Sequence, residues 1–121
     1  MYKKIMENMG TKIMERLVVK LGKELIILKC EDIDWIESEK NYLRVYKGEL
    51  SFLIRYTMSN FEKKLDPSVF VRVNRSAIVN IERIRKIESD PNYNYFVIMN
   101  NNVTVSWGRK FRRNLKKVLY N

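Results

Sequence analysis

Short runs of alternating apolar and polar residues follow one another through the first half of the chain and predict a meander of short strands. Apolar runs at residues 17–21 and 24–29 flank Gly22 and Lys23, and glycine at the first position of a two-residue turn is typical of a β-hairpin. Further strands are expected at residues 33–37, 42–47 and 50–55, with a polar hairpin loop at residues 38–41. Residues 1–12 are expected to be a linker or docking segment, and residues 13–121 to form one domain.

One internal helix is expected at residues 57–65. Thr57 is a suitable N-cap, and Met58, Phe61 and Leu65 recur at helical spacing on one face. A proline follows shortly afterwards and ends the run. The apolar face of this helix is therefore expected to cap the sheet.

The second half is expected to be rich in strands as well. Residues 70–80 read FVRVNRSAIVN, in which two β-type runs flank the polar triplet Asn74, Arg75 and Ser76. Strands should follow at residues 83–89, 95–99 and 103–107, with a turn at residues 100–102, because asparagine tolerates the left-handed conformation. An amphipathic helix at residues 109–120 closes the chain. The pattern predicts a mainly β, antiparallel sheet or sandwich with one short internal helix and a C-terminal amphipathic helix.

Charge is distributed unevenly along the chain. The formal net charge is +10 over 121 residues. Residues 1–70 hold 13 Lys and Arg against 11 Asp and Glu (+2), whereas residues 71–121 hold 11 against 3 (+8). This asymmetry favours a basic footprint for a polyanion, either nucleic acid or an anionic membrane surface. The closing helix is part of it, because residues 106–121 contain six basic residues and no acidic one.

Several function classes are disfavoured by composition. Histidine is absent and Cys30 is the single cysteine, which removes the commonest general base and the commonest transition-metal ligand. No enzyme activity, metal or other cofactor is therefore expected, and the carboxylates of Glu37 and Glu39 are ordinary on a solvated strand. The lone cysteine, with no signal-peptide core and no run of about 18 apolar residues, indicates a cytoplasmic protein.

Blocks spread across most of the chain resemble the LytTR family, the DNA-binding effector domains of bacterial response regulators. They are the run IDWIESEKNYLRVY at residues 33–46, the helix, and FVRVNRSAIVN followed by a strand expected at residues 81–87. A hairpin leading to Ser106 and the closing basic helix complete the match. The resemblance implies an elongated β fold that sends loops into the DNA major groove. It also implies a two-component transcription regulator that binds direct repeats in promoters and bends the DNA.

The resemblance places base-reading loops at residues 40–42, at Asn74 and Arg75, and just after Ser106. The Arg75 guanidinium suits guanine O6 and N7, and Asn74 stands where many members have histidine. Gly108 occupies a position that is often basic, so Arg109 is expected to take that contact. The expected base-contacting residues are Asn74, Arg75, Tyr42 and Arg109, and the expected phosphate-contacting residues are Lys40, Asn41, Ser76, Ser106, Lys110, Arg112, Arg113 and Lys116.

Two residues beside the triplet are expected to be structural. Arg72 lies within the preceding strand and is expected to pair with an acid such as Glu37 rather than touch DNA. Asn80 is expected to tie a turn through side-chain hydrogen bonds.

The alternative function is binding of single-stranded RNA, for which Tyr42, Tyr46 and Tyr56 are candidate stacking platforms, although they are scattered along the chain. The preferred partner is double-stranded DNA. A homodimer on DNA is a further expectation. The resemblance implies a phosphorylatable receiver domain, for which these 121 residues leave no room, so the chain is expected to be either the effector half of a longer regulator or a stand-alone regulator.

Overall fold

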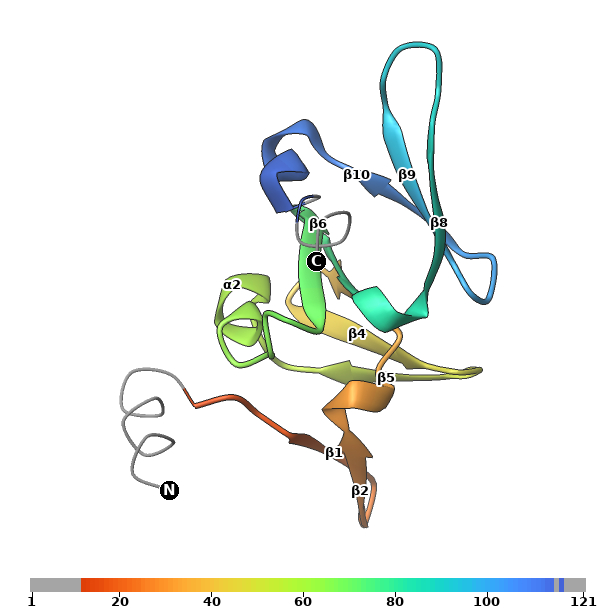
Figure 1. Ribbon diagram of the computed structural model, residues 1–121. Coiled ribbons are helices and arrows are strands. Elements are labelled where there is room, and N and C mark those ends of the chain that lie inside the picture. Colours follow the sequence, from red (N-terminus) through yellow and green to blue (C-terminus); the bar gives the residue numbers. More distant parts are fainter. Residues whose placement is uncertain (1–11, 115, 117–121) are drawn as a thin grey trace, which may run out of the picture.

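The computed structural model describes residues 12–114 and residue 116 (Figure 1). In chain order its strands are β1 (Arg16–Leu21), β2 (Glu24–Lys29), β3 (Trp35–Glu39), β4 (Tyr42–Lys47), β5 (Leu50–Ile54), β6 (Phe70–Asn74), β7 (Ala77–Asn80), β8 (Ile84–Ser89), β9 (Tyr95–Met99) and β10 (Thr104–Trp107). The α-helix α2 (Met58–Glu62) and the 3₁₀-helices η1 (Cys30–Asp32), η2 (Ile81–Arg83) and η3 (Arg109–Asn114) lie between and after them.

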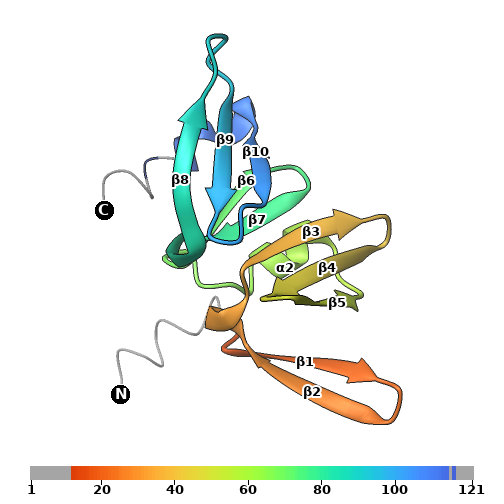
Figure 2. The ribbon, with the colours of Figure 1, turned by 90° about the vertical axis from the view of Figure 1, so that its right-hand side faces the viewer.

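Within the described residues the strands form three antiparallel sheets. Their strand orders are β1-β2, β5-β4-β3-β7-β6 and β10-β9-β8. Figure 2 shows the three-stranded sheet above the five-stranded one and the β1-β2 hairpin below it. This arrangement confirms the predicted mainly β, elongated antiparallel fold with few helices.

Strands β3, β6 and β7 of the five-stranded sheet bury residues on both faces, and successive side chains of a strand point to opposite sides. Ile36 and Ile78 face a lower core that is shared with the hairpin and with Phe61 of α2. Their neighbours Trp35 and Val79 face an upper core that is shared with the three-stranded sheet. The middle sheet is thus held rigidly between two layers, which matters for the turns at its ends.

The first hairpin and the internal helix form as expected. Gly22 has a φ of +60° at the turn between β1 and β2, the left-handed region that glycine enters without steric cost. The hydroxyl of Thr57 accepts a hydrogen bond from the Asn60 amide at 3.1 Å and caps α2. Met58 and Phe61 are buried against the sheet, although the α-helical part is shorter than the predicted span.

Three other expectations need correction. Strand β3 begins at Trp35, so the loop expected at residues 38–41 contracts to a turn at residues 40–41. Residues 81–83 form η2 rather than a strand, because the Asn80 side chain accepts a hydrogen bond from the Glu82 amide and caps a helical turn there.

The closing helix also differs from expectation. Residues 109–114 form a 3₁₀-helix instead of the first turns of an α-helix, and the Phe111 amide donates to the Gly108 carbonyl three residues back at 3.0 Å. The Trp107 indole N–H donates to the Phe111 carbonyl at 2.8 Å, which holds this oxygen toward the core. Of the predicted helix beyond Asn114, residue 115 and residues 117–121 lie outside the described residues.

Candidate nucleic-acid interface

Two hairpin turns lie side by side at one end of the five-stranded sheet (Figure 2). Strands β3 and β7 pair antiparallel, so the β3-β4 turn at residues 40–41 and the β6-β7 turn at residues 75–76 are neighbours. The Ser38 amide donates to the Ser76 carbonyl at 2.9 Å and continues this pairing into the turns. Two of the three predicted loops are therefore brought together by the sheet itself.

The third predicted loop joins them from the other direction. The Gly108 amide donates to the Val73 carbonyl at 2.7 Å, and the Asn74 side-chain amide donates to the Ser106 carbonyl at 2.8 Å. These bonds dock the end of β10 and the start of η3 against β6, where Arg109 is exposed. We call the three segments, residues 40–42, 74–76 and 106–110, the loop cluster.

The two central residues of the cluster have different surroundings. Arg75 is exposed, and its guanidinium has no hydrogen-bond or ion-pair partner among residues 12–114 and 116. Both polar atoms of the Asn74 side chain are engaged, because Oδ1 accepts from the Ser76 amide at 2.7 Å while Nδ2 donates to Ser106. Arg75 is available for a ligand, whereas Asn74 braces the turn in this structure.

The first loop contains a strained residue and an exposed ring. Lys40 has a φ of +56°, a backbone conformation that residues other than glycine and asparagine rarely adopt. Tyr42 is 41% exposed, and the Arg55 guanidinium carbon lies 5.9 Å from the centre of its ring. Sequence reasoning missed Arg55. The signal was its place one residue past Ile54, which pairs with Leu43 and so sets Arg55 opposite Tyr42.

The basic residues of η3 divide into exposed and anchored ones. Arg109, Lys110 and Arg113 are exposed, as is Lys116 beyond η3. Arg112 is half-buried: its guanidinium carbon lies 4.5 Å from the centre of the Tyr95 ring, and it donates a hydrogen bond to the Tyr93 carbonyl. A phosphate contact by Arg112 requires this packing to open.

The ion pairs of the described residues do not involve the cations of the loop cluster. The cations that lie within 4 Å of a carboxylate are Arg44 with Glu39, Arg72 with Glu62, Arg83 with Asp32 and Asp34, and Lys86 with Glu88. Within the described residues, no such pair involves Lys40, Arg75, Arg109, Lys110, Arg113 or Lys116. The positive potential of the cluster is therefore not neutralised locally.

The two residues expected to be structural, Arg72 and Asn80, each connect segments of the fold. Arg72 pairs with Glu62 at 3.1 Å, not with Glu37, which instead accepts a hydrogen bond from the Tyr46 hydroxyl at 2.9 Å. Burial and this hydrogen bond raise the pKa of Tyr46 to about 12. Asn80 is fully buried and bonds to the backbone before β3, which confirms its predicted role.

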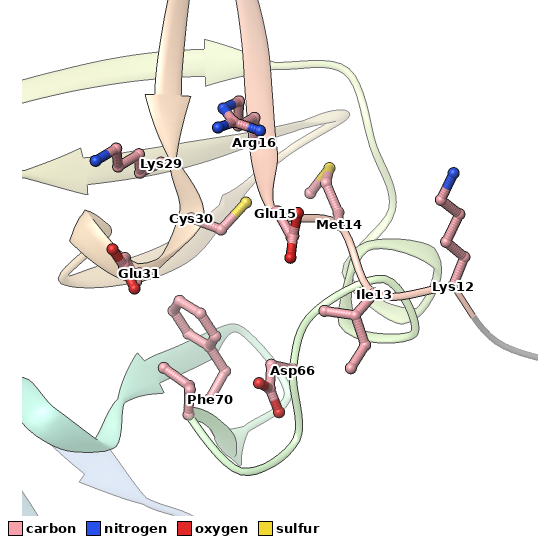
Figure 3. A pocket seen from close by; sticks show the side chains of 11 residues that line it. Lys12, Ile13, Met14, Glu15, Arg16, Lys29, Cys30, Glu31, Asp66 and Phe70 are labelled. Atoms are coloured by element: carbon pink, nitrogen blue, oxygen red, sulfur yellow. The ribbon is translucent and has the colours of Figure 1, made fainter. Parts of the chain in front are cut away.

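A cavity of about 670 Å³ lies away from the loop cluster, between the first hairpin and the segment after α2 (Figure 3). Charges of both signs line it, from Arg16 and Lys29 to Glu31 and Asp66. The thiol of Cys30 is also in this lining, and burial raises its pKa to about 11. This mixed lining does not suit a polyanion and shares no residue with the cluster.

Two further findings concern the described residues alone. No three Cys, Asp or Glu side chains among them are grouped so as to hold a metal ion. None of the helices in this part of the chain has the length and apolar character needed to cross a membrane.

The model of the LytTr DNA-binding domain family matches residues 23–120, and the chain belongs to that family. It is 31% identical over 105 residues to the sensory transduction protein LytT of Bacillus subtilis, covering 87% of this chain and 44% of LytT. It is 27% identical over 112 residues to the transcriptional regulatory protein LytR of Staphylococcus aureus, covering 93% of this chain and 46% of LytR. The chain thus spans less than half the length of these relatives.

A solved structure shows the same fold. The LytTr DNA-binding domain of a response regulator from Bacillus cereus superposes with a TM-score of 0.78, over 89% of this chain and 99% of that one, at 23% sequence identity. The family and fold expected from the sequence are thereby confirmed.

Proposed function

We propose that this chain is a sequence-specific, double-stranded DNA-binding domain of a transcription regulator, in which the loop cluster enters the major groove. The observation that carries the proposal is the convergence of three loops from distant parts of the sequence, each bearing cations without an acidic partner among the described residues. Two relatives with regulatory names, LytT and LytR, support a role in transcription. The domain is taken to comprise residues 13–121, with residues 1–12 as a linker or docking segment.

Within the cluster, Arg75 is assigned to base recognition. Its guanidinium is exposed on a two-residue turn at the end of a rigid sheet, and a guanidinium matches guanine O6 and N7 in the major groove. Asn74 and Arg109 flank it, and Tyr42 lies in the neighbouring loop. Asn74 can read a base only if its side chain breaks its hydrogen bonds to Ser106 and Ser76. We therefore assign it a smaller part in base recognition than Arg75.

The remaining exposed residues of the cluster, together with Arg113 and Lys116 just after it, are assigned to phosphates, which fix the register of the domain on the duplex. They are Lys40, Asn41, Ser76, Ser106, Lys110, Arg113 and Lys116, to which the structure adds Arg55 beside Tyr42. Arg112 is also assigned to a phosphate, and this contact requires its guanidinium to leave the Tyr95 ring. Binding to direct repeats and bending of the duplex are included in the proposal because the resemblance to the LytTR family implies them.

Selection of duplexes from a random pool gives the motif and the spacing of its repeats. On the selected duplex, Arg75→Ala should weaken binding by about 1–3 kcal/mol and leave the affinity for a scrambled duplex unchanged. Replacement of the contacted guanine by 7-deazaguanine, which removes N7, should weaken the wild-type protein and leave Arg75→Ala unaffected. An unchanged ratio of affinities for selected and scrambled duplexes in Arg75→Ala would show that Arg75 does not read a base.

Phosphate contacts have a different signature. Lys116→Ala and Arg55→Ala should each weaken binding to both duplexes alike and reduce the slope of log affinity against log salt by about one. Arg85→Ala is the matched control, because Arg85 is exposed on β8, the edge strand farthest from β10. Fluorescence energy transfer between the duplex ends then tests bending, and an unbent complex would contradict that part of the proposal.

The alternative, single-stranded RNA binding, is less favoured because two of its three candidate stacking rings pack against other aromatic rings of the protein. The Tyr46 ring stacks on Trp35 with centroids 4.5 Å apart, and Tyr56 packs edge-on against Phe61 at 5.1 Å. Of the three candidate tyrosines only Tyr42 is exposed. Tighter binding to single-stranded RNA than to duplex DNA at the same salt concentration would overturn the main proposal.

A further inference from the structure

The turn that carries Arg75 is held by a side chain of its own hairpin and by backbone amides from outside it. The register of the ladder between β6 and β7 shifts between Arg72 and Asn74. Four successive carbonyl oxygens, those of residues 73–76, each accept a hydrogen bond from outside the turn. The two outer ones, on Val73 and Ser76, receive backbone amides of other strands or loops.

The two inner carbonyls are bound by one side chain. Arg72 donates from Nε to the Asn74 carbonyl at 3.2 Å and from one terminal nitrogen to the Arg75 carbonyl at 2.7 Å. Its other terminal nitrogen donates to the Glu62 carboxylate on α2 at 3.1 Å. A guanidinium presents its donors in a fixed planar fork, so these three bonds define the position of the turn relative to the helix.

Arg72 is also fixed from the other side. The ring of Phe111 in η3 lies 5.5 Å from the guanidinium carbon, and the Asn114 side chain donates to the Arg72 carbonyl at 2.9 Å. The Arg72 side chain is only 15% exposed. Each of its three nitrogens donates a hydrogen bond within the protein, which leaves it little capacity to bind a phosphate.

We propose that Arg72 is a positioning residue that sets the conformation of the turn at residues 75–76, and that Glu62 orients Arg72 for this task. With both inner carbonyls drawn inward by Arg72, the Arg75 side chain faces outward. This role rests on the proposed function of Arg75. Through Arg72, base recognition by Arg75 would depend on α2 and η3, although neither element needs to touch the DNA bases.

The test uses substitutions that keep charge or shape. Arg72→Lys retains the positive charge but loses the fork, and it should lower the affinity for the selected duplex at least tenfold. The affinity for a scrambled duplex and the salt slope should stay as in the wild type, because Arg72 contacts no phosphate. Glu62→Gln should give a several-fold loss in the same direction. Glu88→Gln, which breaks a 3.6 Å ion pair on β8, is the matched control and should change nothing.

A second readout needs no DNA. The Ser76 amide hydrogen donates to Asn74 Oδ1 at 2.7 Å, so its exchange with solvent should accelerate in Arg72→Lys and in Glu62→Gln but not in Glu88→Gln. This measurement stands even if the wild-type protein selects no duplex, in which case the proposed function fails and the positioning role is judged by exchange alone. If Arg72→Lys does not fold, Glu62→Gln decides, since Glu62 is 44% exposed on the surface.

Either of two outcomes would overturn the inference. One is a folded Arg72→Lys variant with the wild-type specificity ratio and wild-type exchange at Ser76. The other is a salt slope reduced by about one in Arg72→Ala, which would identify Arg72 as a direct phosphate contact.

Discussion

Replacing the buried Asn80 by alanine should lower the free energy of unfolding by about 3 kcal/mol. The Asn80 side chain is fully buried, and Nδ2 donates to the carbonyls of Glu31 at 3.0 Å and Ile33 at 2.9 Å. Its Oδ1 accepts from the Glu82 amide at 2.9 Å. At about 1 kcal/mol net for each bond, the three together give this loss, a large share of the roughly 5–15 kcal/mol that stabilises a typical domain.

Urea unfolding followed by circular dichroism measures the effect, and Asn92→Ala is the matched control. Asn92 is exposed, and only its backbone amide is hydrogen-bonded within the described residues. The control should therefore unfold like the wild type. A loss below about 1 kcal/mol in Asn80→Ala, or equal losses in the two variants, would refute the view that Asn80 ties β7 to the segment before β3.

Asn80→Asp tests the same geometry through pH. Burial and the facing carbonyl oxygens should raise the pKa of the new carboxyl above its unfolded value of about 3.9. A group whose pKa is raised on folding contributes most stability below its unfolded pKa and loses it as pH rises. The Asp variant should therefore fall further below the Ala variant at pH 7 than at pH 4. A constant gap across this range would mean that the carboxyl does not face those carbonyls.

Three other outcomes are expected. Phe61→Ala should cost about 3–5 kcal/mol in thermal or urea unfolding, because Phe61 is fully buried where α2 meets the sheet; a loss under about 1 kcal/mol would contradict this packing. The Arg44 guanidinium beside Glu39 lowers the pKa of that carboxyl, so Arg44→Ala should raise it toward its ordinary value in an NMR titration, and an unmoved titration would be the contrary result. Burial raises the pKa of Cys30 to about 11, so a disulfide reagent at pH 8 should label the folded protein much more slowly than the urea-unfolded one; equal rates would rule out burial of the thiol.

Local turn and capping residues made the hairpins and the internal helix predictable from the sequence. Gly22 marks the first hairpin through its positive φ, and Thr57 caps the helix through a bond three residues ahead. Such signals act over two to four residues and are visible in the sequence. The same holds for the outward position of Arg75 in a two-residue turn.

Contacts between segments that are far apart in the sequence could not be predicted from the sequence. The pairing of β3 with β7 and the docking of Gly108 on Val73 determine that the loops converge, yet no local pattern encodes either. Arg112 illustrates the same limit, because its basic neighbours in η3 are exposed while its own guanidinium packs on Tyr95. The sequence therefore predicted which basic residues the candidate interface contains, but not which of them pack against the protein.

The position of Trp107 gives the protein an optical probe of its own. Its indole is 3% exposed, lies one residue after Ser106, and is bonded to the Phe111 carbonyl at 2.8 Å. The other tryptophan, Trp35, is stacked on Tyr46 between the strands of the middle sheet. In a Trp35→Phe protein the emission therefore comes from a single indole beside the loop cluster, and any shift of η3 on the duplex is recorded as a change in fluorescence without a label.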